Sequence, residues 1–179
     1  MSRVVMKPQE IGRALSRIAH EILDKHGDAE RLAIVGLASG GAHLAKRLAD
    51  IIHDLESINP PFGTLDVTFH RDDFRTRAKP PAFPTDITFS IDERDVLLVD
   101  DVFYTGRTTR AALDALMEYG RPKTVQLAVL IDRGHRELPI SPDYVGRVVT
   151  TNYDDEVKVD LSEAAGKDLV TVEEAQQKK

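Results

Sequence analysis

The chain has 179 residues, a formal net charge of −6, and a composition that is 41% hydrophobic and 30% charged. This length and balance predict one globular α/β domain with its own core. The chain has no cysteine, which excludes a disulfide framework and a thiolate site. No window approaches about 18 uninterrupted apolar residues, and the first residues lack a signal-peptide core, so we expect a cytoplasmic protein with no membrane partner. The negative charge argues against indiscriminate nucleic-acid binding but leaves room for a local basic face.

The first third of the chain predicts two helices around a short buried strand. Pro8–His26 carries apolar residues at helical spacing and ends at Gly27. Leu32–Leu37 is a continuous apolar run, which is typical of a strand buried on both faces. The glycine pair Gly40-Gly41 then precedes a second helix with apolar residues at positions 44, 48, 51, 52 and 55.

The next segment changes from a strand to a long loop. Leu65, Val67 and Phe69 alternate with polar residues, which predicts a half-exposed strand. Residues 71–85 are charged and rich in proline. Loops of this length inside compact domains are usually functional, so we expect a flexible lid here.

The second half of the chain predicts more strands and one more helix. Residues 96–99 form a buried strand, and the amphipathic helix after it is closed by Gly120 and Pro122. Residues 125–131 form another buried strand, residues 132–142 are irregular, and short strands follow at 145–149 and 157–161. Residues 173–179 are polar and expected to be frayed. The β-α-β alternation predicts a mostly parallel sheet with helices on both faces, in a single domain spanning 1–179.

The most informative stretch is residues 96–109, Val-Leu-Leu-Val-Asp-Asp-Val-Phe-Tyr-Thr-Gly-Arg-Thr-Thr. Asp100 and Asp101 come at the end of the strand, where open α/β sheets bind their ligands. Paired carboxylates can accept hydrogen bonds from vicinal hydroxyls and can hold Mg²⁺, which prefers oxygen ligands. Gly106 allows close backbone approach, and the loop around it opens a helix whose N-terminus favours an anion. A plain strand, polar turn and helix cap is the alternative reading.

This stretch resembles the signature of type I phosphoribosyltransferases, which bind phosphoribosyl pyrophosphate (PRPP). The resemblance implies that Asp100 and Asp101 bind the ribose hydroxyls and the metal, with Mg²⁺ as cofactor. It also implies a loop that holds the 5′-phosphate, formed by Thr105, Gly106, Arg107, Thr108 and Thr109.

Two further segments complete the site that this resemblance implies. Ser39, Gly40 and Gly41 follow the first buried strand and are the candidates for pyrophosphate binding, although a tight strand-to-helix turn also uses such residues. Arg71 joins the pyrophosphate site and the catalytic machinery with Asp100 and Asp101. The lid adds Arg75, Arg77 and Lys79, which suit a pyrophosphate but also suit a solvated loop.

Residues 131–139, Ile-Asp-Arg-Gly-His-Arg-Glu-Leu-Pro, carry several charges after a buried strand and suggest a small hood over the base. Together with the signature, they resemble the family of pyr operon attenuation regulators that are also uracil phosphoribosyltransferases (PyrR). The similarity covers most of the chain, from Ile11 to Leu161. It implies conversion of uracil and PRPP to UMP and pyrophosphate in a homodimer or homotetramer. The base-binding candidates are Asp132, Arg133, Gly134 and His135.

The same resemblance implies binding of pyrimidine-operon leader RNA when UMP is present. The candidates share one face of the first helix: Arg13, Ser16, Arg17 and His20. Against this, the family's late basic segment is replaced by the acidic run Asp154-Asp155-Glu156, which predicts weak RNA binding. A purine as the base, or nucleotide sensing without RNA regulation, stay open as alternatives.

Overall fold

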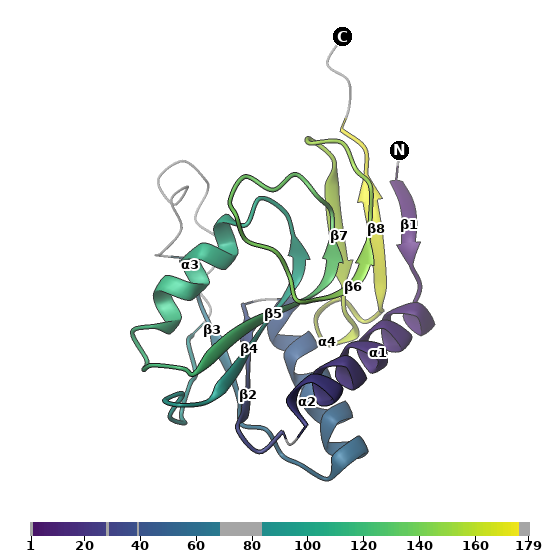
Figure 1. Cartoon of the computed structure of the whole chain (residues 1–179). Coiled ribbons are helices and arrows are strands. Elements are labelled where there is room, and N and C mark those ends of the chain that lie inside the picture. The colour runs from purple at the N-terminus through teal and green to yellow at the C-terminus, as the bar shows by residue number, and fades with distance from the viewer. Residues whose placement is uncertain (1, 28, 39, 69–83, 176–179) are drawn as a thin grey trace.

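The computed structural model describes residues 2–27, 29–38, 40–68 and 84–175 (Figure 1). The helices and strands along the chain are β1 Ser2–Met6, α1 Pro8–His26, β2 Leu32–Leu37, α2 Gly40–Glu56, β3 Phe62–Leu65, β4 Asp95–Phe103, α3 Arg107–Leu116, β5 Thr124–Asp132, β6 Tyr144–Val148, β7 Glu156–Asp160, α4 Ser162–Ala165 and β8 Leu169–Glu173. None of the helices in these ranges is long and apolar enough to cross a membrane.

The central element is a five-stranded parallel sheet in the order β3-β2-β4-β5-β6. Because all its strands are parallel, their carboxyl ends meet at one edge, where a ligand site is expected. In Figure 1, α3 covers one face of this sheet, and α1 and α2 cover the other. This arrangement confirms the predicted α/β class with a parallel sheet flanked by helices.

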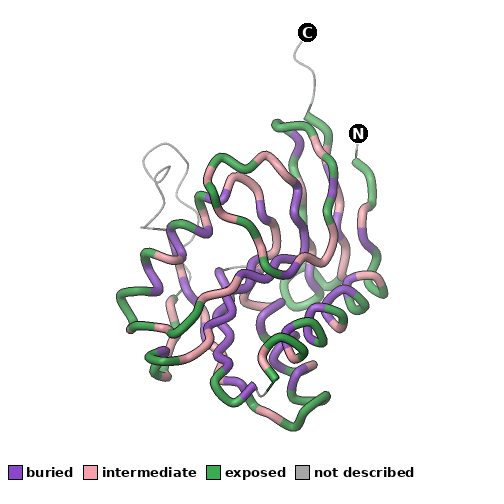
Figure 2. Tube along the Cα trace, viewed as in Figure 1, coloured by how far each residue is buried: buried purple, intermediate pink, exposed green. Residues whose placement is uncertain are grey.

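Side-chain alternation along β4 divides the core between the two faces. Val96 and Leu98 pack with the cluster that includes α3. Leu97 and Val99 pack with the cluster that includes α1 and α2. Successive strand residues point to opposite faces, so a continuous apolar run is what a strand buried on both sides requires. Figure 2 shows this burial along the central strands.

A second, smaller sheet was not predicted from the sequence. It is antiparallel, in the order β1-β8-β7, and it brings the two ends of the described chain together. In Figure 1 it stands beside the carboxyl-end edge of the main sheet, above α1. Its inner residues Val170 and Val172 join the core cluster of α1 and α2. Long-range pairing of short strands leaves little local signal, which explains the omission.

Several predicted boundaries were wrong. The buried strand expected at residues 96–99, with Asp100 and Asp101 at its end, is β4, which spans Asp95–Phe103 and includes both acids. The strand expected around Leu65, Val67 and Phe69 is β3, which ends at Leu65. The frayed tail was expected to begin at Glu173, but Glu173 ends β8 and its carboxylate pairs with Lys158 Nζ at 2.8 Å. The two predicted helices in the first third were correct, with α1 spanning Pro8–His26.

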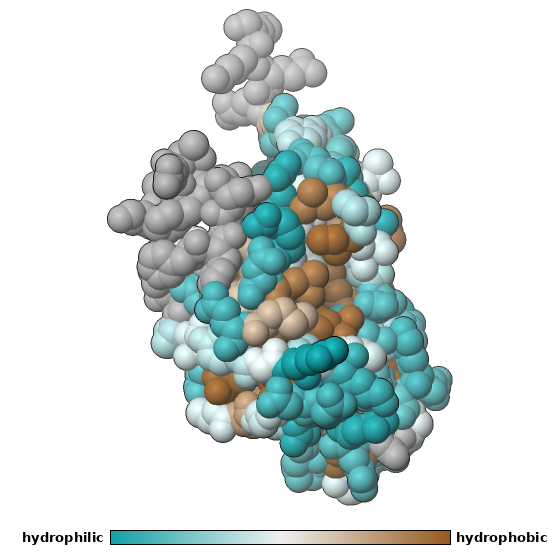
Figure 3. Space-filling view, turned by 60° about the vertical axis from the view of Figure 1, so that its left-hand side comes forward, coloured by the Kyte–Doolittle hydropathy of each residue, from teal (hydrophilic) through white to brown (hydrophobic). Residues whose placement is uncertain are grey.

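The face shown in Figure 3 has hydrophilic regions around a band of apolar side chains. Among the described residues, the most exposed large apolar side chain is Val148, at 72%. Single exposed apolar residues are common on soluble proteins and need no special explanation.

Candidate functional site

The signature stretch forms a pocket at the carboxyl end of β4. The pocket is a partly open hollow of about 650 Å³, a volume that includes open solvent. Residues 102–109 form most of its wall, Asp100 also lines it, and Glu137 and Tyr153 line it from other segments. The structure therefore places Asp100 and the predicted phosphate loop in one concave site.

The phosphate loop owes its shape to Gly106. This residue precedes α3 with a φ of 91°, a left-handed conformation that glycine adopts without strain. The carbonyl of Gly106 accepts the Arg110 backbone N–H at 2.9 Å, and Thr105 Oγ1 accepts the Arg107 N–H at 3.4 Å. Thr109 is buried beneath the loop. The first turn of α3 thus faces the pocket with the positive end of the helix dipole.

The two predicted ribose-binding acids point in different directions. Asp100 is buried and lines the pocket. Asp101, one residue later in the strand, turns toward α2 on the opposite face. Each acid accepts a hydrogen bond from the backbone N–H of the residue that follows it: Asp100 Oδ1 accepts the Asp101 N–H at 2.9 Å, and Asp101 Oδ1 accepts the Val102 N–H at 2.8 Å.

The start of α2 packs tightly against the acid pair. A Cβ atom on Gly40 would lie 2.3 Å from Asp101 Oδ2, and one on Gly41 would lie 2.3 Å from the Val99 carbonyl oxygen. Only glycine allows this approach. Burial raises the pKa of Asp101, so its carboxylate favours the protonated form more than an exposed aspartate does. Gly40 and Gly41 therefore lie beside the acid pair, while Ser39 lies outside the described residues.

The predicted hood residues make mainly internal contacts. The buried Arg133 donates from Nη2 to the carbonyl oxygens of Asn152 and Tyr153, at 2.8 and 3.1 Å, and its guanidinium lies 4.1 Å from the Tyr104 ring centre. Asp132 accepts the Gly134 N–H at 2.9 Å, and His135 Nε2 lies 2.8 Å from the Thr151 carbonyl oxygen. These four residues do not line the pocket described above. Arg133 and His135 fasten the loop after β5 to residues 151–153.

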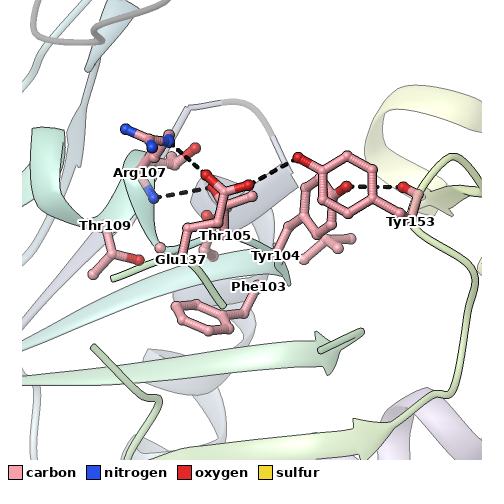
Figure 4. Close-up of a pocket in the computed structure, with 11 residues that line it drawn as sticks. Phe103, Tyr104, Thr105, Arg107, Thr109, Glu137 and Tyr153 are labelled. Atoms are coloured by element: carbon pink, nitrogen blue, oxygen red, sulfur yellow. Dashed lines mark hydrogen bonds and ion pairs between the residues drawn. The ribbon is translucent and has the colours of Figure 1, made fainter. Parts of the chain in front are cut away.

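The pocket is also lined by three residues that were not predicted as site residues: Tyr104, Glu137 and Tyr153. Glu137 lies between the phosphate loop and Tyr153: its Oε2 accepts from Arg107 Nε at 2.9 Å and its Oε1 accepts from Tyr153 OH at 2.8 Å (Figure 4). The Tyr104 hydroxyl donates to the Tyr153 carbonyl oxygen at 2.8 Å. The signal available in the sequence was one tyrosine within the signature and another immediately before the acidic run.

The predicted lid falls mostly outside the described residues. Arg71, Arg75, Arg77 and Lys79 all lie in the segment 69–83. The far end of the loop is described and is anchored to β3, because Thr85 Oγ1 accepts the Asp66 N–H at 3.0 Å and Asp86 pairs with Thr64.

The residues present fit a magnesium ion only together with the substrate. Within the described ranges, no group of three or more His, Asp or Glu side chains is placed to hold a metal. Asp100 and Asp101 offer carboxylate oxygens, which suit Mg²⁺, an ion that commonly takes one or two protein carboxylates and completes its shell with water and phosphate oxygens.

The RNA-binding candidates on α1 are only partly available. Arg17 pairs with Glu21 at 2.7 Å and also donates to the carbonyl oxygens of Val145 and Gly146, at 2.9 and 2.7 Å. His20 Nδ1 lies 2.7 Å from the Ser16 carbonyl oxygen. Arg13 is exposed and makes no hydrogen bond or ion pair with the described residues.

The acidic run differs from its expected form. Asp155 is buried and accepts the backbone N–H groups of Asn152, at 2.7 Å, and Ala175, at 3.2 Å. These hydrogen bonds lower its pKa, Asn152 contributing most. Asp154 and Glu156 are exposed, so the run presents two surface carboxylates and not three.

Known proteins resemble the chain along almost its whole length. The family model described as "Phosphoribosyl transferase domain" matches residues 5–163. The Bifunctional protein PyrR of Syntrophobacter fumaroxidans is 51% identical over 177 residues, which cover 98% of this chain and 95% of that protein. The chain belongs to the PyrR family. It is therefore a phosphoribosyltransferase, as the signature predicted.

Other comparisons agree with this membership. The Bifunctional protein PyrR of Deinococcus radiodurans is 52% identical, covering 93% of this chain and 91% of that protein. Among solved structures, a hypoxanthine phosphoribosyltransferase of Trypanosoma cruzi has a TM-score of 0.73 at 18% identity, covering 95% of this chain and 90% of that chain. One from Staphylococcus aureus has a TM-score of 0.70 at 20% identity, covering 98% and 93%. These two structures show a shared fold with PyrR family members and nothing about the base.

Proposed function

We propose that this PyrR family member joins uracil to the ribose 5-phosphate of PRPP, releasing UMP and pyrophosphate. The observation that carries the proposal is the pocket that Asp100 of β4 lines together with the Gly106 turn at the start of α3. Uracil is preferred to a purine because relatives at about 50% identity carry the name PyrR, whereas the purine enzymes match at 20% or less.

The pocket supplies positioning and electrostatics, not a covalent group. As the bond from C1′ to pyrophosphate breaks, positive charge builds on the ribose, as in glycoside hydrolysis. Asp100 would hold the ribose hydroxyls in the pocket, and residues 105–109 would hold the 5′-phosphate. Gly40 and Gly41, beside Asp101, would let backbone N–H groups approach the pyrophosphate. Arg71 is proposed as a further cation on the pyrophosphate, and Asp132 to His135 as supports of the base site.

We further propose Mg²⁺ as the cofactor. Because Asp100 and Asp101 lie on opposite faces of β4, they would hold the ion together with PRPP either directly or through metal-bound water. When bound, it would neutralise charge on the leaving pyrophosphate. Asp101 contributes a carboxylate whose raised pKa a nearby cation would lower again, since opposite charge favours the ionised form. We also infer that residues 1–179 act as one domain in a cytoplasmic homodimer or homotetramer.

The test of the enzymatic proposal is pyrophosphate release from PRPP with uracil, hypoxanthine and guanine supplied in turn. Release with uracil alone is expected, and it should be absent in the Asp100→Asn variant. Equal or faster release with either purine would contradict the choice of base while leaving the transferase assignment intact.

We propose UMP-dependent binding of pyrimidine-operon leader RNA as the second activity. It is supported by membership of a family whose members are named bifunctional and by the exposed Arg13 on α1. The acidic run opposes it less than its sequence suggests, because the Asp155 carboxylate is turned inward. The remaining surface carboxylates and the net charge of −6 predict modest affinity with a strong salt dependence.

The RNA proposal is tested by titrating a leader hairpin at about 0.15 M salt, with and without UMP. Arg13→Ala should weaken binding without changing the unfolding temperature. Arg17→Ala is a poorer test because Arg17 also holds the β6 edge through Val145 and Gly146. Binding that ignores UMP, or that Arg13→Ala leaves unchanged, would contradict this second activity.

A further inference from the structure

Glu137 links the phosphate loop to a separate surface loop. Its backbone N–H donates to the Thr105 carbonyl oxygen at 3.0 Å, which fixes the residue against the phosphate loop. Its two carboxylate oxygens then divide between Arg107, at 2.9 Å, and the Tyr153 hydroxyl, at 2.8 Å. Figure 4 shows the carboxylate between these two partners. One acidic side chain thus joins the start of α3 to the loop between β6 and β7.

The charge of Glu137 conflicts with the ligand expected in this pocket. Glu137 and the phosphate loop line the same space. A 5′-phosphate bound there would compete with the carboxylate for Arg107 and would repel it, because like charges a few ångströms apart at a protein surface interact strongly. Neither contact is locked by burial, since the side chains of Arg107 and Glu137 are 43% and 32% exposed.

The Tyr153 side of the link depends on the same carboxylate. Tyr153 is 53% exposed, and its ring packs against Tyr104 and His135 with centre separations of 5.5 and 5.7 Å. The Glu137 hydrogen bond is the largest cause that raises the pKa of Tyr153 to about 12. If the carboxylate moves, the phenol loses this acceptor, whereas Arg133 and Tyr104 still hold the Tyr153 carbonyl oxygen.

We propose that Glu137 is a positioning residue that holds Arg107 and Tyr153 in the empty pocket, and that a 5′-phosphate displaces it and releases the Tyr153 side chain. The proposal rests on the assignment of residues 105–109 to the 5′-phosphate. It supplies a physical route by which an occupied pocket changes the surface next to Asp154, and so a basis for nucleotide-dependent regulation.

The experiment follows Tyr153 directly. The chain contains only four tyrosines and no tryptophan, so ¹³C-labelled tyrosine rings can be resolved and assigned by NMR. Saturating ribose 5-phosphate or UMP should shift the Tyr153 ring signals, whereas uridine, which lacks the phosphate, should not. Tyr119, exposed in the turn after α3, serves as an internal reference.

Variants at position 137 test the cause of the shift. Glu137→Gln keeps the size and the backbone hydrogen bond but removes the charge, so ribose 5-phosphate should bind about tenfold more tightly. In this variant the ligand should no longer produce the full Tyr153 shift. Glu56→Gln makes the same charge change at the far end of α2 and should leave affinity unchanged. Tyr153→Phe should also raise affinity, by a smaller factor, because the ligand no longer has to break that hydrogen bond.

The outcomes distinguish a failure of the Glu137 proposal from a failure of the assignment of residues 105–109 to the 5′-phosphate. If ribose 5-phosphate fails to bind the unmodified protein, both the phosphate loop and the role of Glu137 are wrong. If it binds but Tyr153 does not respond, or Glu137→Gln binds it no more tightly, the role of Glu137 alone is wrong. Thermal unfolding of each variant shows whether the variant still folds. If the unfolding temperature is unchanged, a change in affinity does not come from a loss of fold.

Discussion

The backbone of Gly40 lies directly against the carboxylate of Asp101, so closely that a Cβ atom would come within 2.3 Å of Oδ2. The first residue of α2 and the second acid of the Asp100-Asp101 pair therefore form one unit, although 61 positions separate them in the chain (101 − 40). This contact places the proposed pyrophosphate site beside the proposed ribose and metal site. It also makes Gly40 and Asp101 sensitive to changes that the rest of the fold would tolerate.

Gly40→Ala should lower kcat/KM for PRPP by about 10²-fold, because small misplacements of reacting groups have effects of this size. The added methyl group must displace the Asp101 carboxylate or the start of α2. Gly12→Ala is the matched control: Gly12 is exposed in the middle of α1, and a Cβ there meets nothing within 4 Å. That change should leave activity intact and stabilise the protein by about 0.5–1 kcal/mol. Unchanged steady-state kinetics in Gly40→Ala would contradict the role of this contact.

Replacing the acids one at a time should separate function from stability. Asp100→Asn removes a carboxylate that lines the pocket and should reduce turnover by at least about 10²-fold. Asp101→Asn should also reduce turnover, but it should raise the unfolding temperature at neutral pH. The reason is that burial raises the pKa of Asp101, so its ionised form costs folding free energy above that pKa.

The sign of this effect is checked by its pH dependence. Since the folded-state pKa lies above the unfolded value, the wild-type protein gains relative stability as pH falls through the folded-state pKa. The stability difference between Asp101→Asn and wild type should therefore shrink in acid. Calorimetry from neutral to acidic pH measures it, and a constant difference would argue against burial as the cause.

Arg47 fastens α2 to α4 and to the residue that precedes β8, and it should control acid stability. Its guanidinium pairs with Asp168 at 2.7 Å and with Glu163 at 2.6 Å. The hydrogen bond from Arg47 is the main cause that lowers the pKa of Asp168 from 3.8 to about 2. A lowered pKa stabilises the fold above the unfolded value, so this contribution is present above pH 4 and is lost as pH falls toward 2.

Asp168→Asn should therefore lower the free energy of unfolding by about 1–2 kcal/mol at neutral pH, after discounting for solvent screening. The difference from wild type should vanish near pH 2. Lys46→Ala removes the exposed pair with Asp50 on the same helix and should change stability by less than about 0.5 kcal/mol. Denaturant titrations at several pH values compare the two. An equal loss in both variants would show that the Arg47 cluster has no special role.

Removal of divalent cations should abolish transfer. The carboxylates of Asp100 and Asp101 are negatively charged and cannot neutralise a leaving pyrophosphate. Excess chelator should therefore stop turnover, and added Mg²⁺ should restore it. Thiol-modifying reagents should have no effect, because the chain contains no cysteine. Full turnover in chelator would contradict the proposed cofactor.

The sequence by itself determined the parts of this protein that depend on local pattern. Helical spacing with a glycine stop predicted α1, and apolar runs predicted β2, β4 and β5, because burial on both faces of a parallel sheet requires continuous apolar residues. The signature at 96–109 predicted a strand associated with two acids and a turn at Gly106, since both are set by residues adjacent in the chain, but not that the strand continues past the acids to Phe103.

Only the tertiary structure decided the relationships between distant segments. Three examples are the pairing of β1 with β8, the inward turn of Asp155, and the Glu137 bridge from Arg107 to Tyr153. In each, the sequence around the contacting residues does not indicate the contact. The opposite orientations of Asp100 and Asp101 follow from strand alternation, but which acid faces the pocket depends on the side of the sheet that α3 covers. Such choices are made by packing between elements, where free energy depends on burial and charge in the assembled fold and not on local propensity.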